Sequence, residues 1–282
     1  MIEYLDGGMI YELNKLYSDL GQIAILKYPQ IVESIYQNYI DLGCHYLTTC
    51  NYGFKSLKFD NWEELTQKGL EIIQRVKNKN YSKNLKILGC LPPYHESYHL
   101  GEVNSDFRNF YRKLFHLMEP YVDTYILETQ VDPKHVTAIL NIMFELGIKK
   151  KIMVSIYPHG KIEKKHLHNW IKYHKHRLEA FLINCASFSD MMLYYFTEIN
   201  GLHIQENNIH FGFYCNKIDE KGYAKWSGDK SKLIRLQDFE SPELIDSHQL
   251  QIFLKYLEKR YPKIIIGGCC GYGKEELKEL IK

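Results

Sequence analysis

Cys269 and Cys270 are the side chains best suited to chemistry in this sequence. They directly follow three isoleucines at 264–266 and the pair Gly267-Gly268. A run of β-branched residues indicates a buried strand, and glycines allow a tight turn at its end. Adjacent cysteines in such a place are poorly positioned for a disulfide, which needs Cβ atoms that face each other. They suit a soft metal such as zinc, which requires a third ligand from elsewhere in the chain.

The elements that must position these thiols alternate along the sequence. Eight short apolar runs are predicted to be strands: 2–5, 46–49, 85–88, 124–127, 152–156, 180–183, 209–213 and 263–266. Seven segments with apolar residues at helical spacing are predicted to be helices: 28–42, 62–77, 107–117, 133–146, 166–176, 189–200 and 247–259. Asp60, and Asp132 with Pro133, are expected to begin two of these helices.

Eight strands in βα alternation predict an α/β protein with one (β/α)8 TIM barrel, a single domain over residues 1–282. The alternative is an open, doubly wound sheet, but no glycine-rich phosphate-binding turn follows the first predicted strand. Residues 217–241 are the least regular stretch and are predicted to form a long loop after the seventh strand.

Composition excludes several classes of protein. The chain has 282 residues, of which 45% are hydrophobic and 25% charged, as in ordinary globular domains. A net charge of +2 with intermixed signs gives no extended surface for nucleic acid. The N-terminus does not resemble a signal peptide, and no apolar run reaches the roughly 18 residues of a membrane span. Seven cysteines, an odd number, favour a reducing compartment, so a cytoplasmic location is expected; a homo-oligomer is left open.

Six of the seven cysteines end or follow a predicted strand, and only Cys44 precedes one. In a barrel the C-terminal strand ends form one rim, where active sites lie. Cys44, Cys50 and Cys90 are interpreted as small buried hydrophobic residues. Cys185, after the sixth strand, and the pair after the eighth strand are the candidates for chemistry because of the residues beside them.

Several motifs occur in a distinctive order. They are Leu5-Asp6-Gly7-Gly8-Met9, Thr48-Thr49 with Tyr52, Gly89-Cys90-Leu91-Pro92-Pro93-Tyr94, Glu128-Thr129, Asn184-Cys185 and Gly267-Gly268-Cys269-Cys270. With them the sequence resembles the homocysteine S-methyltransferase family over its whole length. A vicinal cysteine pair alone is a weak signal, whereas these motifs together are a strong one.

The resemblance implies a zinc site whose ligands are Cys185, Cys269 and Cys270. Three thiolates leave one tetrahedral position open for a substrate sulfur. Zinc binds the thiolate form, so a thiol with a pKa of about 8.5 becomes a nucleophile at neutral pH. Asn216 matches the family's asparagine after the seventh strand, which can lie near the metal when substrate is absent. Cys215 is predicted not to be a ligand, because a fourth thiolate would close the site.

The resemblance also implies how homocysteine binds. The carboxylates of Asp6 and Glu128 are expected to hold its ammonium group. The backbone N–H groups of Gly7 and Gly8, with the Thr49 region, are expected to face its carboxylate. The plainer alternatives are a turn aspartate before two glycines and an exposed or salt-bridged glutamate at a strand end.

The function predicted from the resemblance is transfer of a methyl group to homocysteine, giving methionine, from a donor such as S-methylmethionine or S-adenosylmethionine. The alternatives are a methyltransferase for another thiol or selenol, and a non-catalytic zinc barrel that binds thiol amino acids. The segments Ile10-Tyr11 and Gly271-Tyr272-Gly273 depart from common family residues and leave the donor open. The rings of Tyr11, Tyr223 and Trp226 are expected to face a sulfonium donor at the rim.

Overall fold

The computed structural model describes residues 1–16, 24–55, 57–216 and 247–281. Its strands are β1 (Ile2–Tyr4), β2 (Tyr46–Thr48), β3 (Lys86–Leu91), β4 (Thr124–Gln130), β5 (Ile152–Ile156), β6 (Leu178–Asn184), β7 (His210–Cys215) and β8 (Ile264–Gly268). Its α-helices are α1 (Met9–Leu16), α2 (Ala24–Lys27), α3 (Pro29–Asp41), α4 (Trp62–Lys79), α5 (Ser105–Met118), α6 (Pro133–Glu145), α7 (Lys164–His174), α8 (Phe188–Tyr194), α10 (Ser247–Glu258) and α11 (Lys274–Ile281). A π-helix, η1 (Tyr195–Ile199), continues α8, and a short 3₁₀ helix, η2 (Ile204–Asn207), follows.

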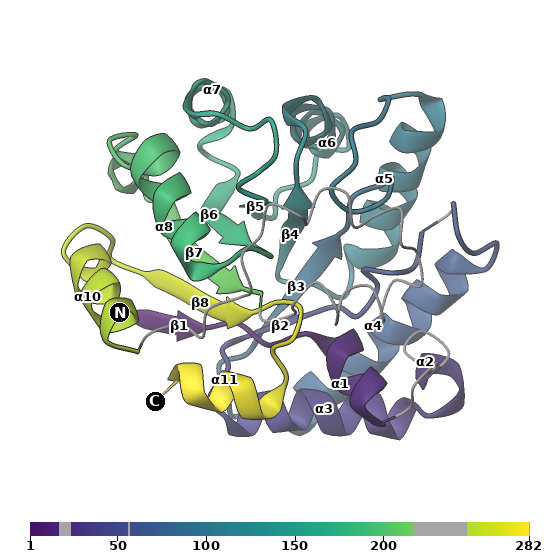
Figure 1. Cartoon of the computed structure of the whole chain (residues 1–282). Coiled ribbons are helices and arrows are strands. Elements are labelled where there is room, and N and C mark those ends of the chain that lie inside the picture. The colour runs from purple at the N-terminus through teal and green to yellow at the C-terminus, as the bar shows by residue number, and fades with distance from the viewer. Residues whose placement is uncertain (17–23, 56, 217–246, 282) are drawn as a thin grey trace.

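The eight strands form one parallel sheet that closes on itself. They are hydrogen-bonded in the order β1-β8-β7-β6-β5-β4-β3-β2. β1 and β2 complete the ring through a parallel bridge between Leu5 and Tyr46, and the N–H of Asp6 donates to the Tyr46 carbonyl at 3.1 Å. The helices lie outside the strands (Figure 1). The predicted single-domain (β/α)8 TIM barrel is therefore confirmed.

All eight predicted strands occur, and their ends differ from the predicted ones by at most three residues. The predicted helix 189–200 is divided, since its second half is the π-helix η1. The short helices α1, α2 and α11 were not predicted. The prediction that Asp60 caps α4 is wrong, because Asn61 occupies the cap position and makes no side-chain cap bond, whereas Asp132 caps α6 as expected. The predicted loop 217–241 lies outside the described residues.

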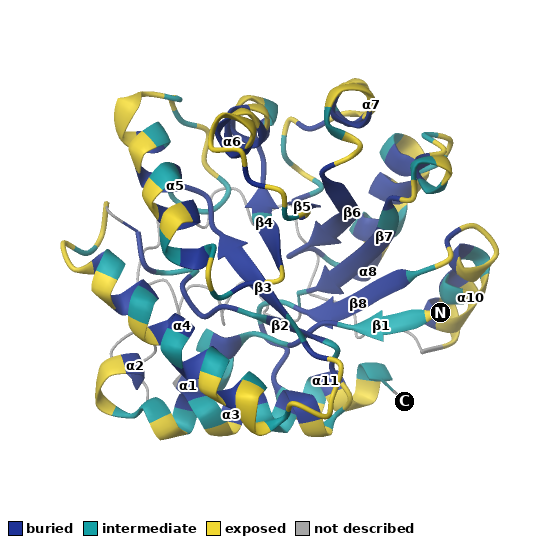
Figure 2. Cartoon of the chain, turned by 180° about the vertical axis from the view of Figure 1, so that it is seen from behind, coloured by how far each residue is buried: buried dark blue, intermediate teal, exposed yellow. Residues whose placement is uncertain are grey.

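The hydrophobic core has two layers, one inside the barrel and one between barrel and helices. Along β8, Ile265 points into the barrel, while Ile264 and Ile266 pack against the helices. The inner layer also contains Leu5, Leu88, Ile126, Met153 and Leu182. Figure 2 shows the result: most of the strands are buried, and the helices are exposed on their outward sides. None of the described helices has the length and apolar character needed to cross a membrane.

Charged side chains occupy the N-terminal end of the barrel. Glu3 accepts a hydrogen bond from the Tyr46 hydroxyl at 2.5 Å and pairs with Lys263 at 2.9 Å. Lys86 pairs with Glu179 at 3.5 Å across the same end. In each pair the two charges neutralise each other, so this end of the barrel is closed by paired polar side chains. The opposite end holds the cavity described next.

Candidate active site

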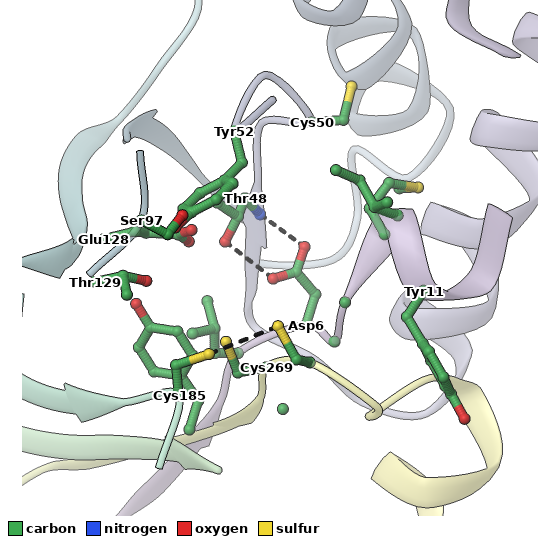
Figure 3. A pocket seen from close by; sticks show the side chains of 18 of the residues that line it. Asp6, Tyr11, Thr48, Cys50, Tyr52, Ser97, Glu128, Thr129, Cys185 and Cys269 are labelled. Atoms are coloured by element: carbon green, nitrogen blue, oxygen red, sulfur yellow. Dashed lines mark hydrogen bonds between the residues drawn. The ribbon is translucent and has the colours of Figure 1, made fainter. Parts of the chain in front are cut away.

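A cavity lies at the C-terminal ends of the strands, the rim where TIM-barrel active sites occur. Its walls come from the ends of β1, β2, β4, β6 and β8, from the start of α1 and from the β3–α5 connection. Figure 3 shows Asp6 with Thr48 near its centre, Cys185 and Cys269 together on one side, and Tyr11 on the side opposite Glu128. The Asp6, Glu128 and cysteine motifs, far apart in sequence, therefore meet in one space.

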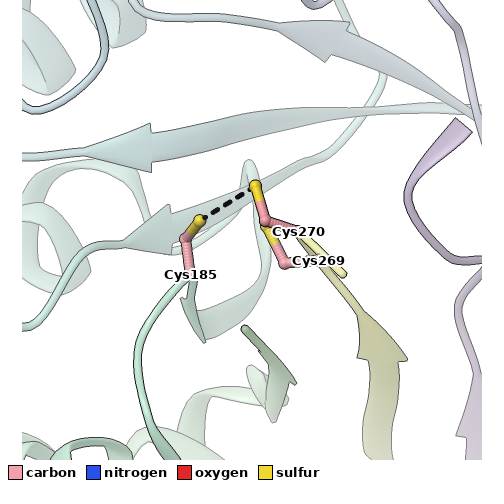
Figure 4. A group of neighbouring side chains, drawn as sticks. All are labelled: Cys185, Cys269 and Cys270. Atoms are coloured by element: carbon pink, nitrogen blue, oxygen red, sulfur yellow. Dashed lines mark hydrogen bonds between the residues drawn. The ribbon is translucent and has the colours of Figure 1, made fainter. Parts of the chain in front are cut away.

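Three sulfurs from β6 and β8 converge at this rim. Cys185 follows β6 directly, Cys269 and Cys270 follow β8, and their Sγ atoms all lie within 4.8 Å of one another (Figure 4). The sulfurs of Cys185 and Cys270 are 3.6 Å apart. A tetrahedral zinc ion with Zn–S bonds of about 2.3 Å requires neighbouring sulfurs about 3.8 Å apart. The spacing of the three thiols therefore fits a zinc ion.

The local backbone and the electrostatics favour such a cation. Cys185 has a φ of +59°, a left-handed conformation that is uncommon outside glycine, and this turns its chain at the end of β6. Hydrogen bonds from Cys269 and Cys270 lower the pKa of the Cys185 thiol, whereas the bond to Cys185 raises the pKa values of Cys269 and Cys270. Hydrogen bonds within the cluster thus stabilise a thiolate only at Cys185. All three cysteines would be thiolates together only with a bound cation to offset their charge.

The sequence analysis also considered Cys215 and Asn216 near the metal. The Cys215 sulfur is buried and 3.6 Å from the Met191 sulfur, and burial raises the pKa of its thiol. Its backbone carbonyl accepts from the Cys269 N–H at 2.8 Å, so Cys215 supports Cys269 through the main chain. Asn216 follows β7, but it is not among the described residues that line the cavity.

Asp6 is buried at the end of β1 and fixed by β2. Its two carboxyl oxygens accept from the Thr48 N–H at 2.7 Å and the Thr48 hydroxyl at 2.9 Å. Burial raises its pKa to about 7, although the Thr48 hydrogen bonds act in the opposite direction. The plainer interpretation as a turn residue explains the Thr48 bonds but not the placement of the carboxyl in a cavity wall.

Glu128 lies near the end of β4 and lines the same cavity, half-buried. Burial raises its pKa to about 8, and the negative charge of Asp6 adds to this rise, while a hydrogen bond with Cys90 opposes it. Within the described chain no lysine, arginine or histidine lines this space. The two carboxyls therefore form an acidic site suited to a cationic ligand group.

Gly7 and Gly8 let the chain pass against the end of β8. A Cβ on Gly7 would lie 2.5 Å from the Tyr272 carbonyl oxygen, and one on Gly8 would lie 2.9 Å from the Cys269 carbonyl oxygen. The Gly8 N–H donates to the Tyr272 carbonyl at 2.7 Å. This differs from the expectation that it faces a substrate carboxylate, because a backbone contact distant in sequence already uses this donor.

Thr49 lines the cavity, but its hydroxyl belongs to an internal network. It donates to the Asn51 side chain at 2.6 Å and accepts from the Cys90 N–H at 2.8 Å. These bonds join the ends of β2 and β3. Thr49 thus shapes the wall, and its neighbour Thr48 is the residue that fixes Asp6.

The sequence analysis missed Tyr98 and Ser97, which come from the β3–α5 connection. The Tyr98 hydroxyl is 2.8 Å from the Cys185 sulfur, and the Ser97 hydroxyl is 2.8 Å from that of Tyr52. Nothing in their spacing marks them, since neither is at a strand end. The only available signal was their position in the connection that follows a barrel strand, where functional residues concentrate.

Fold and cavity place the protein among TIM-barrel enzymes with an active site at the C-terminal rim. A family model described as homocysteine S-methyltransferase matches residues 4–282, so the chain belongs to the homocysteine S-methyltransferase family and is a methyltransferase. No curated protein matches the chain in a sequence comparison.

Solved structures of the homocysteine methyltransferase MmuM from Escherichia coli share the fold. The metallated form is 15% identical with a TM-score of 0.69, and the match covers 99% of this chain and 95% of that one. The oxidized form is 16% identical with a TM-score of 0.70, covering 99% and 94%. At such low identity the likeness establishes the common barrel over nearly the full length of both chains.

Proposed function

We propose that this protein is a zinc-dependent S-methyltransferase that transfers a methyl group from a sulfonium donor to homocysteine, giving methionine. The whole barrel, residues 1–282, serves as the homocysteine-binding domain. One observation carries the proposal: a single cavity holds three sulfurs within 4.8 Å of one another beside the carboxyls of Asp6 and Glu128. Family membership supplies the class of acceptor.

The sulfur end of homocysteine belongs beside the cysteine cluster. Cys185, Cys269 and Cys270 would hold zinc, which would favour the thiolate form of the substrate sulfur. The chain positions these ligands through the backbone. The Cys185 N–H donates to the Tyr214 carbonyl at 3.1 Å, and the Cys269 N–H donates to the Cys215 carbonyl at 2.8 Å. Both ligand strands are thus tied to β7.

The amino-acid end belongs on the opposite wall. Asp6 and Glu128 pair with the ammonium group, which offsets the cost of their buried negative charge. The carboxylate meets the start of α1, where Met9 and Ile10 line the cavity. The first N–H groups of a helix have no partner within the helix and favour an anion. The proposed donors to the substrate carboxylate are therefore the N–H groups of Met9 and Ile10, in place of the Gly8 N–H.

The charge of the cavity favours a cationic methyl donor such as S-methylmethionine or S-adenosylmethionine. Tyr98 lines the wall and supplies an aromatic ring for contact with a sulfonium. Tyr52 also lines the wall, but the Lys55 ammonium already lies 5.5 Å from its ring centroid. Tyr11 also lines it, with its hydroxyl 3.4 Å from a Glu276 carboxyl oxygen. The predicted contributions of Tyr223 and Trp226 lie outside the described residues.

The test is an assay of purified zinc-loaded protein with homocysteine and one donor at a time. Methionine formed from S-methylmethionine, S-adenosylmethionine or methyl-folate is measured by mass spectrometry, with cysteine as an alternative acceptor and Cys269→Ser as the matched control. We expect turnover with a sulfonium and homocysteine, and none in the control. Turnover with methyl-folate alone would overturn the donor, and turnover with cysteine but not homocysteine would overturn the acceptor.

A further inference from the structure

Tyr98 distinguishes one of the three cysteines from the other two. Its hydroxyl oxygen lies 2.8 Å from the Cys185 sulfur. Within the described residues, Cys269 has a weaker polar side-chain contact, from the Asn184 amide nitrogen at 3.9 Å. A thiolate carries no proton, so in the metal-loaded protein the Tyr98 O–H must be the donor and the Cys185 sulfur the acceptor.

We propose that Tyr98 is a positioning residue whose hydrogen bond to Cys185 draws electron density from that sulfur, so that the methyl group goes to the substrate sulfur and not to Cys185. This inference rests on the proposed zinc site. A hydrogen bond to a charged acceptor is among the stronger ones in proteins, and it stabilises the thiolate against reaction. Groups around a metal's ligands commonly tune the metal in this way.

The protection matters because a ligand thiolate is itself a nucleophile. If Cys185 attacked the donor, the methyl–sulfur bond of the sulfonium would break, and its electron pair would stay on the donor sulfur. A new bond between the methyl group and the Cys185 sulfur would form. Cys185 would become a neutral thioether, and the cluster would lose one anionic ligand. The enzyme therefore needs a ligand sulfur that is less reactive than the substrate sulfur beside it.

The surrounding structure holds Tyr98 rigidly in this role. Its φ of +68° is uncommon for a residue with a side chain, and its ring packs on Tyr157 with centroids 4.5 Å apart. The same connection is also fixed just before Tyr98 in the sequence. Ser97 bonds Tyr52, and the His95 carbonyl accepts from the Lys55 ammonium at 2.9 Å. Loss of the Tyr98 hydroxyl alone should thus leave the connection in place.

The first test compares Tyr98→Phe with Tyr52→Phe in cobalt(II)-substituted protein. Tyr52→Phe removes a hydroxyl that holds the same connection through Ser97 but is bonded to no ligand sulfur in the structure. We expect the sulfur-to-cobalt charge-transfer absorption to move to longer wavelength in Tyr98→Phe, because a sulfur that loses its hydrogen bond gives up an electron more easily. The Tyr52→Phe spectrum should match wild type.

The second test measures alkylation of each cysteine in zinc-loaded protein by iodoacetamide, followed by peptide mass spectrometry. We expect Cys185 to react roughly tenfold faster in Tyr98→Phe, the fold-change for loss of a hydrogen bond to a charged group, while Cys269 and Cys270 react at nearly unchanged rates. If wild-type protein binds metal but Tyr98→Phe changes neither the spectrum nor the alkylation rate of Cys185, only the role of Tyr98 is overturned. Wild-type protein that binds neither cobalt nor zinc would overturn the metal site as well.

Discussion

Asp6, which is buried, and Glu128, which is half-buried, are two acidic groups that no described lysine, arginine or histidine of the cavity wall neutralises. Replacing Glu128 by Gln should weaken homocysteine binding roughly 10- to 150-fold, because a charge-assisted bond to the ammonium is lost. Asp6→Asn should weaken it similarly and also disturb the Thr48 bonds. Calorimetry of homocysteine binding measures both, with zinc content as the control. Wild-type affinity in both zinc-loaded variants would show that the ammonium binds elsewhere.

The same two carboxyls should make the metal-free, substrate-free protein less stable as pH rises. Their folded pKa values, about 7 and about 8, exceed the unfolded values of about 3.9 and 4.3. Between pH 5 and 8 the folded state therefore binds more protons than the unfolded state, and stability falls with increasing pH. The midpoint of thermal unfolding should decline over this range and decline less in Glu128→Gln. A variant with the wild-type slope would contradict the raised pKa of Glu128.

Cys215 provides a matched control for the proposed ligand set. It is another buried thiol near the rim, at the end of β7, and its carbonyl bonds the Cys269 N–H. Its sulfur contacts Met191, so Cys215→Ala should retain about one zinc per chain, while Cys269→Ser should lose most of it. Elemental analysis after dialysis against trace chelator separates the two. If Cys215→Ala lost its zinc while Cys269→Ser kept it, the assignment of Cys185, Cys269 and Cys270 as the zinc ligands would be wrong.

At the level of elements, the contact between the β1–α1 turn and the end of β8 positions the proposed ligands Cys269 and Cys270. Gly8→Ala would place a Cβ 2.9 Å from the Cys269 carbonyl oxygen, which must move. We expect a loss of about 1–3 kcal/mol of stability and weaker zinc binding. Gly147→Ala is the control, because that glycine has a φ of +66° but open space around it. Gly147→Ala should destabilise the protein by about 1–2 kcal/mol through backbone strain and should leave zinc affinity unchanged. Equal zinc loss in Gly8→Ala and Gly147→Ala would show that the contact does not position Cys269 and Cys270.

The elements also show which features a sequence can predict. Strand β5 was predicted to the residue from an apolar run that only Ser155 interrupts, and Cys185 was singled out by the strand it follows and the residues beside it. Asp6 and Glu128 were assigned through the family resemblance. α1 and α11 were missed because eight residues give too little periodicity. The Gly8–Tyr272 bond and the Tyr98–Cys185 contact join positions 264 and 87 residues apart, and only the closed barrel brings them together.

For the whole molecule, zinc bound at the rim should stabilise the folded barrel against unfolding. The proposed ligands follow β6 and β8, which flank β7, and folding must bring the three thiols together before they can share one ion. A ligand that binds only the folded state stabilises it by about 2.7 kcal/mol at a hundred times its dissociation constant. For a chain of this length that corresponds to roughly 5 °C in the unfolding midpoint. Chelation should lower the midpoint by at least this amount, and added zinc should restore it in wild type but not in Cys269→Ser. An unchanged midpoint on removal of bound zinc would mean that the three thiols do not hold the ion in the folded barrel.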